Sequence, residues 1–200
     1  LCTKYNSLLI FDEVMTGYRV SHGGAQDYLN VEPDITTLGK VIGGGLPVGA
    51  YGGKNEIMSY ISPEGPVYQA GTLSGNPVSM SAGIAMLKQL ENKKVYEYLN
   101  YITNYLSSGL IEISKKYNYP LIVNSFCSMV GIFCTDKKVE KYKDISKECV
   151  NNYNKLHKYL LDNNIYFPPS AYEALFLSTE IKTNHIDHVL SVFEKFVTEH

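Results

Sequence analysis

The chain has 200 residues, 44% of them hydrophobic and 19% charged, and it carries a formal net charge of −2. A chain of this length can bury a sizeable core as one domain or as two small ones. The near-neutral charge gives no electrostatic basis for binding nucleic acid or an anionic membrane. No apolar run is long enough to span a bilayer, so we expect neither nucleic acid nor membrane as a partner.

The four cysteines, Cys2, Cys127, Cys134 and Cys149, have no CxxC spacing and no partnered histidine cluster. We therefore expect no metal site, and a reducing compartment is the simpler interpretation. That compartment is the cytoplasm, or the plastid stroma if a transit peptide lies upstream. The chain begins at Leu1 rather than at methionine, which is typical of a processed protein or of a fragment.

In chain order, the first predicted element is a strand over residues 7–11, an unbroken apolar run typical of a strand buried on both faces of a parallel sheet. Residues 16–76 are rich in glycine and turn-forming residues and predict mostly loops. Asn76 and Pro77 form a good helix start, because an N-cap is followed by proline at the first helical position. Helical spacing then continues to Pro120 and indicates two helices or one long bent helix.

The last 80 residues of the chain alternate between strand and helix patterns. It predicts two short strands, a helix, another strand and a final amphipathic helix, over residues 121–123, 129–134, 145–161, 174–177 and 186–197. Residues 91–200 are therefore predicted to form an α+β unit, distinct in texture from the loop-rich residues 1–90.

Asp12 follows the predicted buried strand and would lie at the carboxyl edge of a sheet, where open α/β folds bind ligands. An isolated Asp12-Glu13 pair also fits a turn or a helix cap. It fits the magnesium-binding strand of a P-loop module too, although the companion motif G-x-x-x-x-G-K-[ST] is absent. A magnesium-dependent NTP-binding module is therefore kept as an alternative of a different class.

Lys40 is the one charged residue in TTLGKVIGGGLPVGA, residues 36–50. Apolar surroundings make a charged ammonium costly and favour the neutral amine, which adds to carbonyl groups. The glycines Gly43, Gly44 and Gly45 would let the backbone approach a ligand closely. Taken alone, a surface lysine before a flexible loop is the simpler interpretation.

The segment YQAGTLSGNP, residues 68–77, places hydroxyls and accessible backbone N–H groups just before the predicted helix. Thr72 and Ser74 supply the hydroxyls, and Gly71 and Gly75 leave the backbone open. Amides, hydroxyls and a helix dipole can together bind a phosphate, although an ordinary capping loop explains the segment about as well.

A carboxylate, an amine and a phosphate loop are together what a pyridoxal phosphate site requires. LLIFDEVMTGYRV, PDITTLGKVIGGGLPVGAYGG and GPVYQAGTLSGNPVSMSAG resemble segments of the glutamate-1-semialdehyde 2,1-aminomutases, a family within the class III aminotransferases. IYFPPSAYEALFLS resembles the C-terminal segment of that family, so the resemblance runs essentially from end to end. It implies that the chain covers the second half of such an enzyme.

The resemblance implies a fold class as well: α/β, the fold type I of PLP-dependent transferases. Residues 1–90 would be part of the large cofactor-binding domain, with a mostly parallel sheet, and residues 91–200 the small C-terminal α+β domain. Other class III aminotransferases typically have a G-[FL]-G-R-T-G-like turn and a G-G-N-P loop, where this chain has TGYRVSHGGAQ and TLSGNP. Another class III aminotransferase is kept as the second interpretation.

The resemblance also implies roles for individual residues. Asp12 would pair with the pyridine nitrogen of pyridoxal phosphate, and Val14 would pack against the ring face. Lys40 would be the Schiff-base lysine and the proton carrier between substrate carbons. Thr72 would bind the cofactor phosphate of the neighbouring subunit, which implies a homodimer with shared sites.

Three more positions are expected near the substrate, Tyr68 and Gly71 beside the neighbouring subunit and Glu173 as an acidic residue near the site. The implied reaction isomerises the small amino-aldehyde glutamate 1-semialdehyde to 5-aminolevulinate for tetrapyrrole synthesis. The pyridoxamine phosphate form donates the first amino group and is regenerated in the cycle. A non-catalytic fragment that only dimerises is the simplest remaining alternative.

Overall fold

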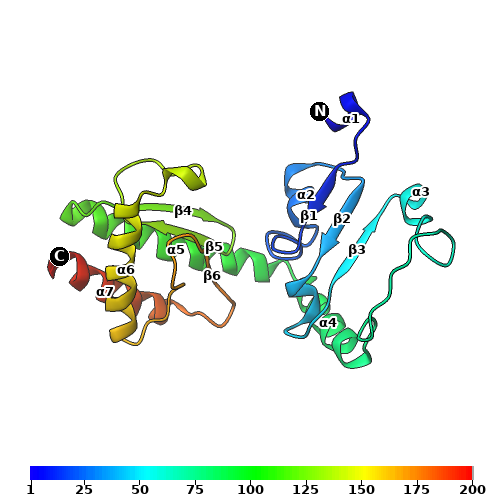
Figure 1. Cartoon of the computed structure of the whole chain (residues 1–200). Coiled ribbons are helices and arrows are strands. Elements are labelled where there is room, and N and C mark those ends of the chain that lie inside the picture. The colour runs from blue at the N-terminus through cyan, green and yellow to red at the C-terminus, as the bar shows by residue number, and fades with distance from the viewer. Residues whose placement is uncertain (200) are drawn as a thin grey trace. The chain divides into compact units, whose positions relative to one another are not determined.

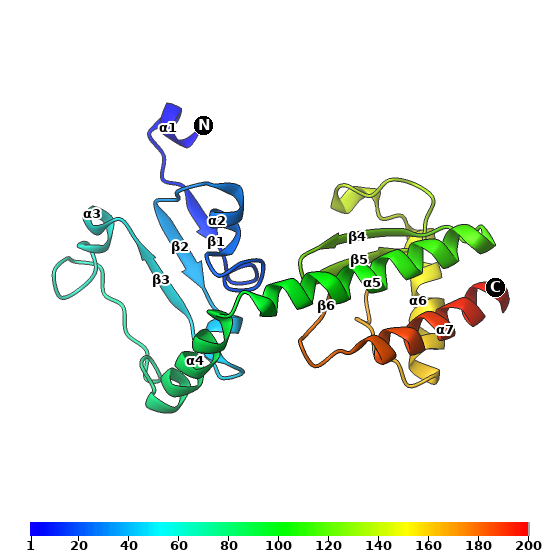
Figure 2. The same ribbon diagram turned by 180° about the vertical axis from the view of Figure 1, so that it is seen from behind.

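The computed structural model describes residues 1–199 and divides into two compact units, Leu1–Lys93 (unit 1) and the chain from Lys94 onward (unit 2). Figures 1 and 2 show the two units from opposite sides. Within the described residues, no helix combines the length and the apolar character needed to cross a membrane.

Unit 1 is built on a three-stranded sheet with the order β1-β2-β3 (β1 Ile10–Asp12, β2 Ile35–Leu38, β3 Ala50–Gly53). Strands β1 and β2 are parallel, because the chain between them is long enough to cross over and includes the helix α2 (Gly24–Leu29). The connection from β2 to β3 contains only one 3-10 turn, Lys40–Gly43, and β3 therefore returns antiparallel. The sheet of this unit is mixed.

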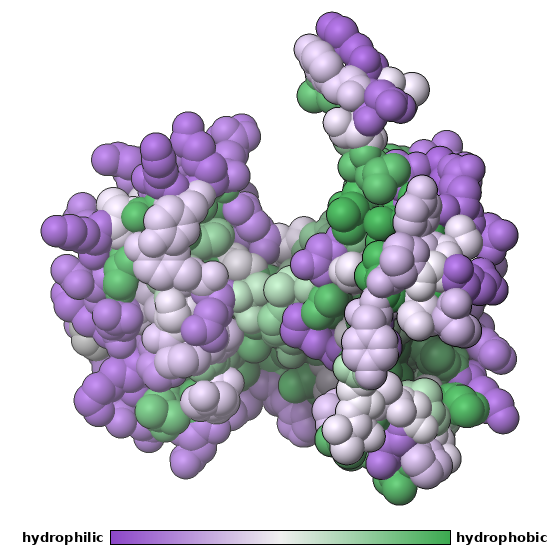
Figure 3. All heavy atoms as spheres, turned by 45° about the vertical axis from the view of Figure 1, so that its right-hand side comes forward, coloured by the Kyte–Doolittle hydropathy of each residue, from purple (hydrophilic) through white to green (hydrophobic). Residues whose placement is uncertain are grey.

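The prediction that the first strand is buried on both faces is wrong for this chain. Strand β1 is an edge strand of the sheet, and Ile10 is 56% exposed. The neighbouring Leu8 is exposed as well. The apolar run reflects the residue types that a covered strand uses, but no described element covers these side chains. Hydrophobic atoms are visible below the projecting N-terminal segment in the space-filling view (Figure 3).

The helix predicted at Pro77 is confirmed as α4, Pro77–Leu90. The Asn76 side chain caps it by accepting hydrogen bonds from the N–H groups of Val78 and Ser79, at 3.1 and 3.2 Å. Two short helices complete unit 1, α1 (Cys2–Tyr5) and α3 (Asn55–Met58).

Unit 2 is the predicted α+β arrangement. Its antiparallel sheet has the order β4-β5-β6 (β4 Ile122–Phe126, β5 Met129–Phe133, β6 Leu175–Phe176). Its long helices are α5 (Lys94–Tyr117), α6 (Lys147–Asp162) and α7 (Thr183–Glu199), with a 3-10 turn at Tyr142–Asp144. Helix α5 packs against α7 and β4. Of the two alternatives predicted for the chain between Pro77 and Pro120, two helices or one long bent helix, the structure has two helices, α4 and α5.

The hydrophobic core of unit 2 lies where these helices meet the sheet. Its fully buried side chains include Ile102, Leu106, Leu156, Phe193 and Phe196. Each of these positions belongs to the apolar face of an amphipathic helix, which explains why the sequence pattern located the helices.

Candidate active site

Asp12 ends β1, and its side chain is exposed at the carboxyl end of the two parallel strands. Its Oδ1 atom accepts two hydrogen bonds, from the N–H of Val14 and from the hydroxyl of Thr37, both at 3.1 Å. No donor in the described part of the chain reaches Oδ2. The carboxylate is thus oriented by its own protein while one oxygen is free for a ligand.

Val14 lies against the chain segment that leads to Lys40. A Cβ atom on Gly39 would lie 3.2 Å from Val14 Cγ1, so the isopropyl group fills the space that Gly39 leaves open. The structure therefore brings Asp12, Val14 and the start of the lysine loop (residues 39–45) together at one edge of the sheet.

Lys40 follows β2 directly and begins the 3-10 turn Lys40–Gly43. Its φ angle is +47°, in the left-handed region that L-residues rarely adopt. The expectation of an enclosing apolar pocket is not met, because the Lys40 side chain is exposed in this chain.

Of the glycines after Lys40, Gly44 serves helix packing, whereas a Cβ on Gly45 would meet nothing within 4 Å. A Cβ on Gly44 would lie 2.5 Å from the carbonyl oxygen of Ala82, and Gly44 also has a φ of +57°. A Cβ on Gly83 would lie 2.3 Å from the carbonyl oxygen of Ile42. These two reciprocal contacts press the lysine loop directly against α4.

Helix α4 in turn begins at the predicted phosphate loop. Thr72 is exposed in a turn that the N–H of Ser74 closes by donating to the carbonyl of Gly71 at 2.9 Å. The N–H groups of Thr72, Leu73 and Gly75 have no acceptor among the described residues. These amides and the Thr72 hydroxyl are available to a phosphate.

The N–H groups in the first turn of α4 are not available to a phosphate. Pro77 has no N–H, and the Asn76 carboxamide already accepts from Val78 and Ser79. The capping side chain therefore occupies these donors, and the N–H groups without an acceptor lie in the preceding loop.

Among the described residues of unit 1, no hydrogen bond or ion pair joins Tyr68 or Gly71 to Asp12 or Lys40. Tyr68 is 82% exposed, and Gly71 is exposed beside it in the same loop. Glu173 belongs to unit 2, where its N–H donates to the carbonyl of Ser170 at 3.1 Å and its side chain is exposed.

Sequence reasoning missed the part played by Glu13. This carboxylate is 1% exposed and accepts hydrogen bonds from the N–H groups of Ala25 and Gln26, at 2.9 and 2.8 Å, and from the Thr16 hydroxyl. Glu13 thus fixes the start of α2 below the candidate site. The available signal in the sequence was the glycine at position 24. In the structure Gly24 has a φ of +74°, and a Cβ there would have no room beside Glu13.

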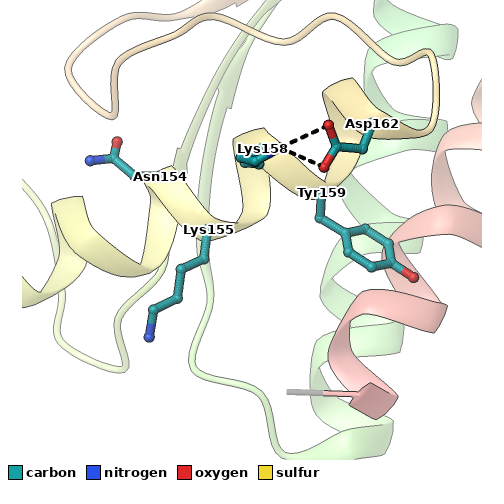
Figure 4. Close-up of a pocket in the computed structure, with 5 residues that line it drawn as sticks. All are labelled: Asn154, Lys155, Lys158, Tyr159 and Asp162. Atoms are coloured by element: carbon teal, nitrogen blue, oxygen red, sulfur yellow. Dashed lines mark hydrogen bonds and ion pairs between the residues drawn. The ribbon is translucent and has the colours of Figure 1, made fainter.

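Unit 2 has hollows of its own that contain none of the candidate residues. One lies beside α6 and is lined by Asn154, Lys155, Lys158, Tyr159 and Asp162 (Figure 4). There Lys158 forms an ion pair with Asp162 at 2.8 Å, and the Tyr159 hydroxyl donates to Glu199 at 3.1 Å. Across residues 1–199, no group of three or more His, Cys, Asp and Glu side chains is arranged to hold a metal ion.

Comparison with curated proteins gives close relatives. The chain is 50% identical over 198 residues to a glutamate-1-semialdehyde 2,1-aminomutase of Clostridium beijerinckii, which covers 98% of this chain and 46% of the relative. It is 51% identical over 197 residues to the enzyme of the same name from Thermosipho melanesiensis, again 98% and 46%. The chain therefore spans about half the length of the curated relatives it matches.

Solved structures agree on the fold. An omega-transaminase from Sphaerobacter thermophilus matches with a TM-score of 0.90 at 30% identity, over 98% of this chain and 45% of that one. A glutamate-1-semialdehyde aminomutase from Pseudomonas aeruginosa matches with a TM-score of 0.82 at 18% identity, over 99% and 46%. The predicted fold of PLP-dependent transferases is thereby confirmed.

The sequence profile of the family described as aminotransferase class-III matches residues 1–196, nearly the whole chain. It includes the strand end at Asp12, the lysine loop and the loop before α4 in a single match. The chain belongs to the class III aminotransferase family.

Proposed function

We propose that this chain forms the second half of a glutamate-1-semialdehyde 2,1-aminomutase that uses pyridoxal 5'-phosphate. The enzyme would convert (S)-4-amino-5-oxopentanoate to 5-aminolevulinate in tetrapyrrole biosynthesis. The observation that carries the proposal is the joint placement of Asp12, Val14 and Lys40 at the carboxyl edge of β1 and β2. Relatives of about 50% identity that bear this name support it.

The residues present fit the cofactor at its three recognition points. Asp12 Oδ2 has no donor among the described residues and can accept from a protonated ring nitrogen. Lys40 presents an exposed amine, and the loop at Thr72 presents a hydroxyl and unused amides to a phosphate. When bound, pyridoxal phosphate supplies an electron sink that allows an amino group to be exchanged between two carbons.

The residues of the chain have distinct tasks in this reaction. Asp12 keeps a proton on the ring nitrogen, since a carboxylate next to that atom stabilises its positive charge. Lys40 would hold the cofactor through its Nζ atom, with the carbonyl oxygen leaving as water, and its amine would carry a proton between C4 and C5 of the substrate. Val14 covers one ring face and excludes water from it.

The phosphate loop supports the proposal of a homodimer. Thr72 and Gly71 are exposed, and no contact joins them to Asp12 or Lys40 in unit 1. We assign Thr72 to the cofactor phosphate of the neighbouring subunit, and Tyr68 and Gly71 to the vicinity of its substrate. Glu173 is assigned to the substrate side of the site, and the cytoplasm or the plastid stroma is the proposed location.

A second candidate is another class III aminotransferase that passes an amino group to an external 2-oxo acid. It is favoured by the structural likeness to the omega-transaminase, which has a higher TM-score and a higher identity than the aminomutase from Pseudomonas aeruginosa. The two candidates differ in stoichiometry, because an aminomutase needs no second substrate. Incubation of the complete polypeptide with glutamate 1-semialdehyde alone should yield 5-aminolevulinate.

The first test is reduction with borohydride after incubation with pyridoxal phosphate, followed by mass mapping of peptides. A reduced pyridoxyl group confined to Lys40 is expected. Lys54 is the matched control, because it also follows a glycine but forms an ion pair with Asp34 at 2.6 Å. Equal labelling of Lys54 and Lys40, or none at Lys40 in the complete polypeptide, would contradict the proposed function.

A further inference from the structure

The Asp12 carboxylate is held from two directions. The Val14 N–H comes from the turn after β1, and the Thr37 hydroxyl comes from the neighbouring strand β2, each 3.1 Å from the same oxygen, Oδ1. Two donors on one oxygen fix both the position and the rotation of the carboxylate. Oδ2 is left as the one oxygen without a donor among the described residues.

The position of Thr37 is itself fixed by the sheet. The parallel register pairs Thr37 with Asp12, and the Thr37 carbonyl accepts from the Glu13 N–H at 2.9 Å. Because Glu13 is buried and hydrogen-bonded to the start of α2, the backbone that carries the Thr37 hydroxyl is anchored on both sides. The hydroxyl therefore reaches Asp12 from a rigid support.

We propose that Thr37 is the positioning residue for Asp12, which acts by presenting Oδ2 to the ring nitrogen of the cofactor. This inference rests on the proposed function, since it assigns Asp12 to that nitrogen. A carboxylate that is already oriented loses less freedom when the cofactor binds, and preorganisation of this kind strengthens binding. Thr37 touches neither cofactor nor substrate in this assignment and acts only through Asp12.

The chain offers a matched control next to Thr37. Thr36 has the same side chain on the same strand, but alternation turns it to the other face, where its hydroxyl lies 3.4 Å from Gln26 Oε1. Replacing either threonine by valine keeps the shape and the strand propensity. Only Thr37→Val removes a donor from Asp12.

The experiment uses the complete polypeptide loaded with pyridoxal phosphate. Thr37→Val, Thr37→Ser, Thr36→Val and Asp12→Asn are compared with the parent by cofactor titration and by the visible absorption of the bound cofactor as a function of pH. Thermal unfolding without cofactor checks that each variant folds. Should Thr37→Val fail to fold, Thr37→Ala removes the same hydroxyl.

Thr37→Val is expected to weaken cofactor binding by about three- to tenfold, the effect of losing one hydrogen bond. The pH midpoint of the absorption change should rise. If Asp12 holds the proton of the ring nitrogen less firmly, the ring carries less positive charge. The Lys40 nitrogen bound to the cofactor is then protonated up to a higher pH. Thr37→Ser should restore both values, and Thr36→Val should leave both unchanged.

Two results would overturn the positioning role alone. One is a Thr37→Val variant with parental affinity and midpoint while Asp12→Asn loses the cofactor. The other is a Thr36→Val variant with the same defect, which would indicate general loosening of β2. If Asp12→Asn also matches the parent, the cofactor site itself is wrongly assigned and the proposed function fails with it.

Discussion

At the residue scale, the Glu13 side chain is a carboxylate in a buried position. Its carboxylate is almost inaccessible, yet no cation pairs with it among the described residues, and its charge is met by two N–H groups at the start of α2 and by the Thr16 hydroxyl. Hydrogen bonds to a charged acceptor are stronger than those between neutral groups. Glu13 therefore couples the turn below Asp12 to α2.

Glu13→Gln should destabilise the chain by about 1–3 kcal/mol, because the new NH2 group meets donors and leaves buried N–H groups unsatisfied. The measurement is the urea midpoint followed by circular dichroism. Glu64→Gln is the control, since Glu64 is exposed. A Glu13→Gln midpoint equal to that of the control would mean that the buried hydrogen bonds contribute little.

Candidate functional residues could be proposed from the sequence where residue type and chemistry coincide. The sequence alone identified Asp12 as a carboxylate after an apolar strand and Lys40 as a lysine among glycines. Which donors remain free could not be predicted, because that depends on hydrogen bonds made in three dimensions. Thus the capping of α4 by Asn76, and the link from Thr37 to Asp12, emerged only from the structure.

At the scale of elements, the lysine loop packs tightly against α4, because the backbones of the two segments approach each other closely at Gly44 and Gly83. Alanine is a better helix former than glycine by about 1 kcal/mol, so Gly83→Ala in an open helix would stabilise. Here the added Cβ would lie 2.3 Å from the Ile42 carbonyl oxygen, which cannot move without the loop.

Gly83→Ala should therefore lower the melting temperature, since overpacking of this kind costs about 1–3 kcal/mol. It should also reduce pyridoxyl labelling at Lys40, because the loop must shift. The control is Gly52→Ala, where an added Cβ meets nothing within 4 Å. A Gly83→Ala variant as stable as the parent would show that the loop yields freely.

Asp34 links the chain segments that lie next to the strands of unit 1. Its carboxylate accepts from the Leu9 N–H at 2.7 Å and pairs with Lys54 at 2.6 Å. The Leu9 hydrogen bond first, and then Lys54, lower the pKa of Asp34 below its usual value. The stabilisation is therefore complete above about pH 4, the ordinary range of a carboxyl group, and is lost as the pH falls through the lowered value.

Asp34→Asn should reduce stability at neutral pH and flatten its loss in acid. Urea midpoints between about pH 2 and about pH 7 measure this, with the exposed Asp136→Asn as the control. If the parent and Asp34→Asn lose stability in parallel over that range, the carboxylate of Asp34 does not contribute to the acid response.

The helices α4 to α7 were predictable, whereas residues 16–76, predicted as mostly loops, also contain α2, β2, β3 and α3. The amphipathic helices α5, α6 and α7 follow from periodicity, and α4 from its capping sequence. The burial of β1 was wrongly predicted, because a hydrophobic run indicates what a strand is suited to contact and says nothing about whether a partner surface is present.

For the whole molecule, the two units differ sharply in how much apolar surface they bury. The buried apolar side chains described in unit 1 are Val20, Ile42 and Leu90, whereas unit 2 has a continuous core formed by three helices and a sheet. Because apolar burial drives folding, unit 2 is expected to be the more stable part.

Cys134 belongs to that core, so the reactivity of its thiol measures whether the core is closed. It is 1% exposed, and burial raises its pKa to about 12, so its thiol reacts only when unit 2 opens. In a urea titration with iodoacetamide pulses, Cys134 should be labelled at a higher urea concentration than that at which the circular dichroism of unit 1 is lost. Cys2, which is partly exposed, should be labelled throughout. Labelling of Cys134 in native buffer as fast as that of Cys2 would contradict a stable core.

The left-handed backbone at Lys40 has a consequence for how this sequence can change by mutation. A φ of +47° disfavours every L-residue by about 1–2 kcal/mol relative to glycine, so glycine would be the more stable choice at this position. Selection for stability alone would therefore replace the one residue that carries the amine. Variants selected only for thermostability are therefore expected to lose Lys40 early.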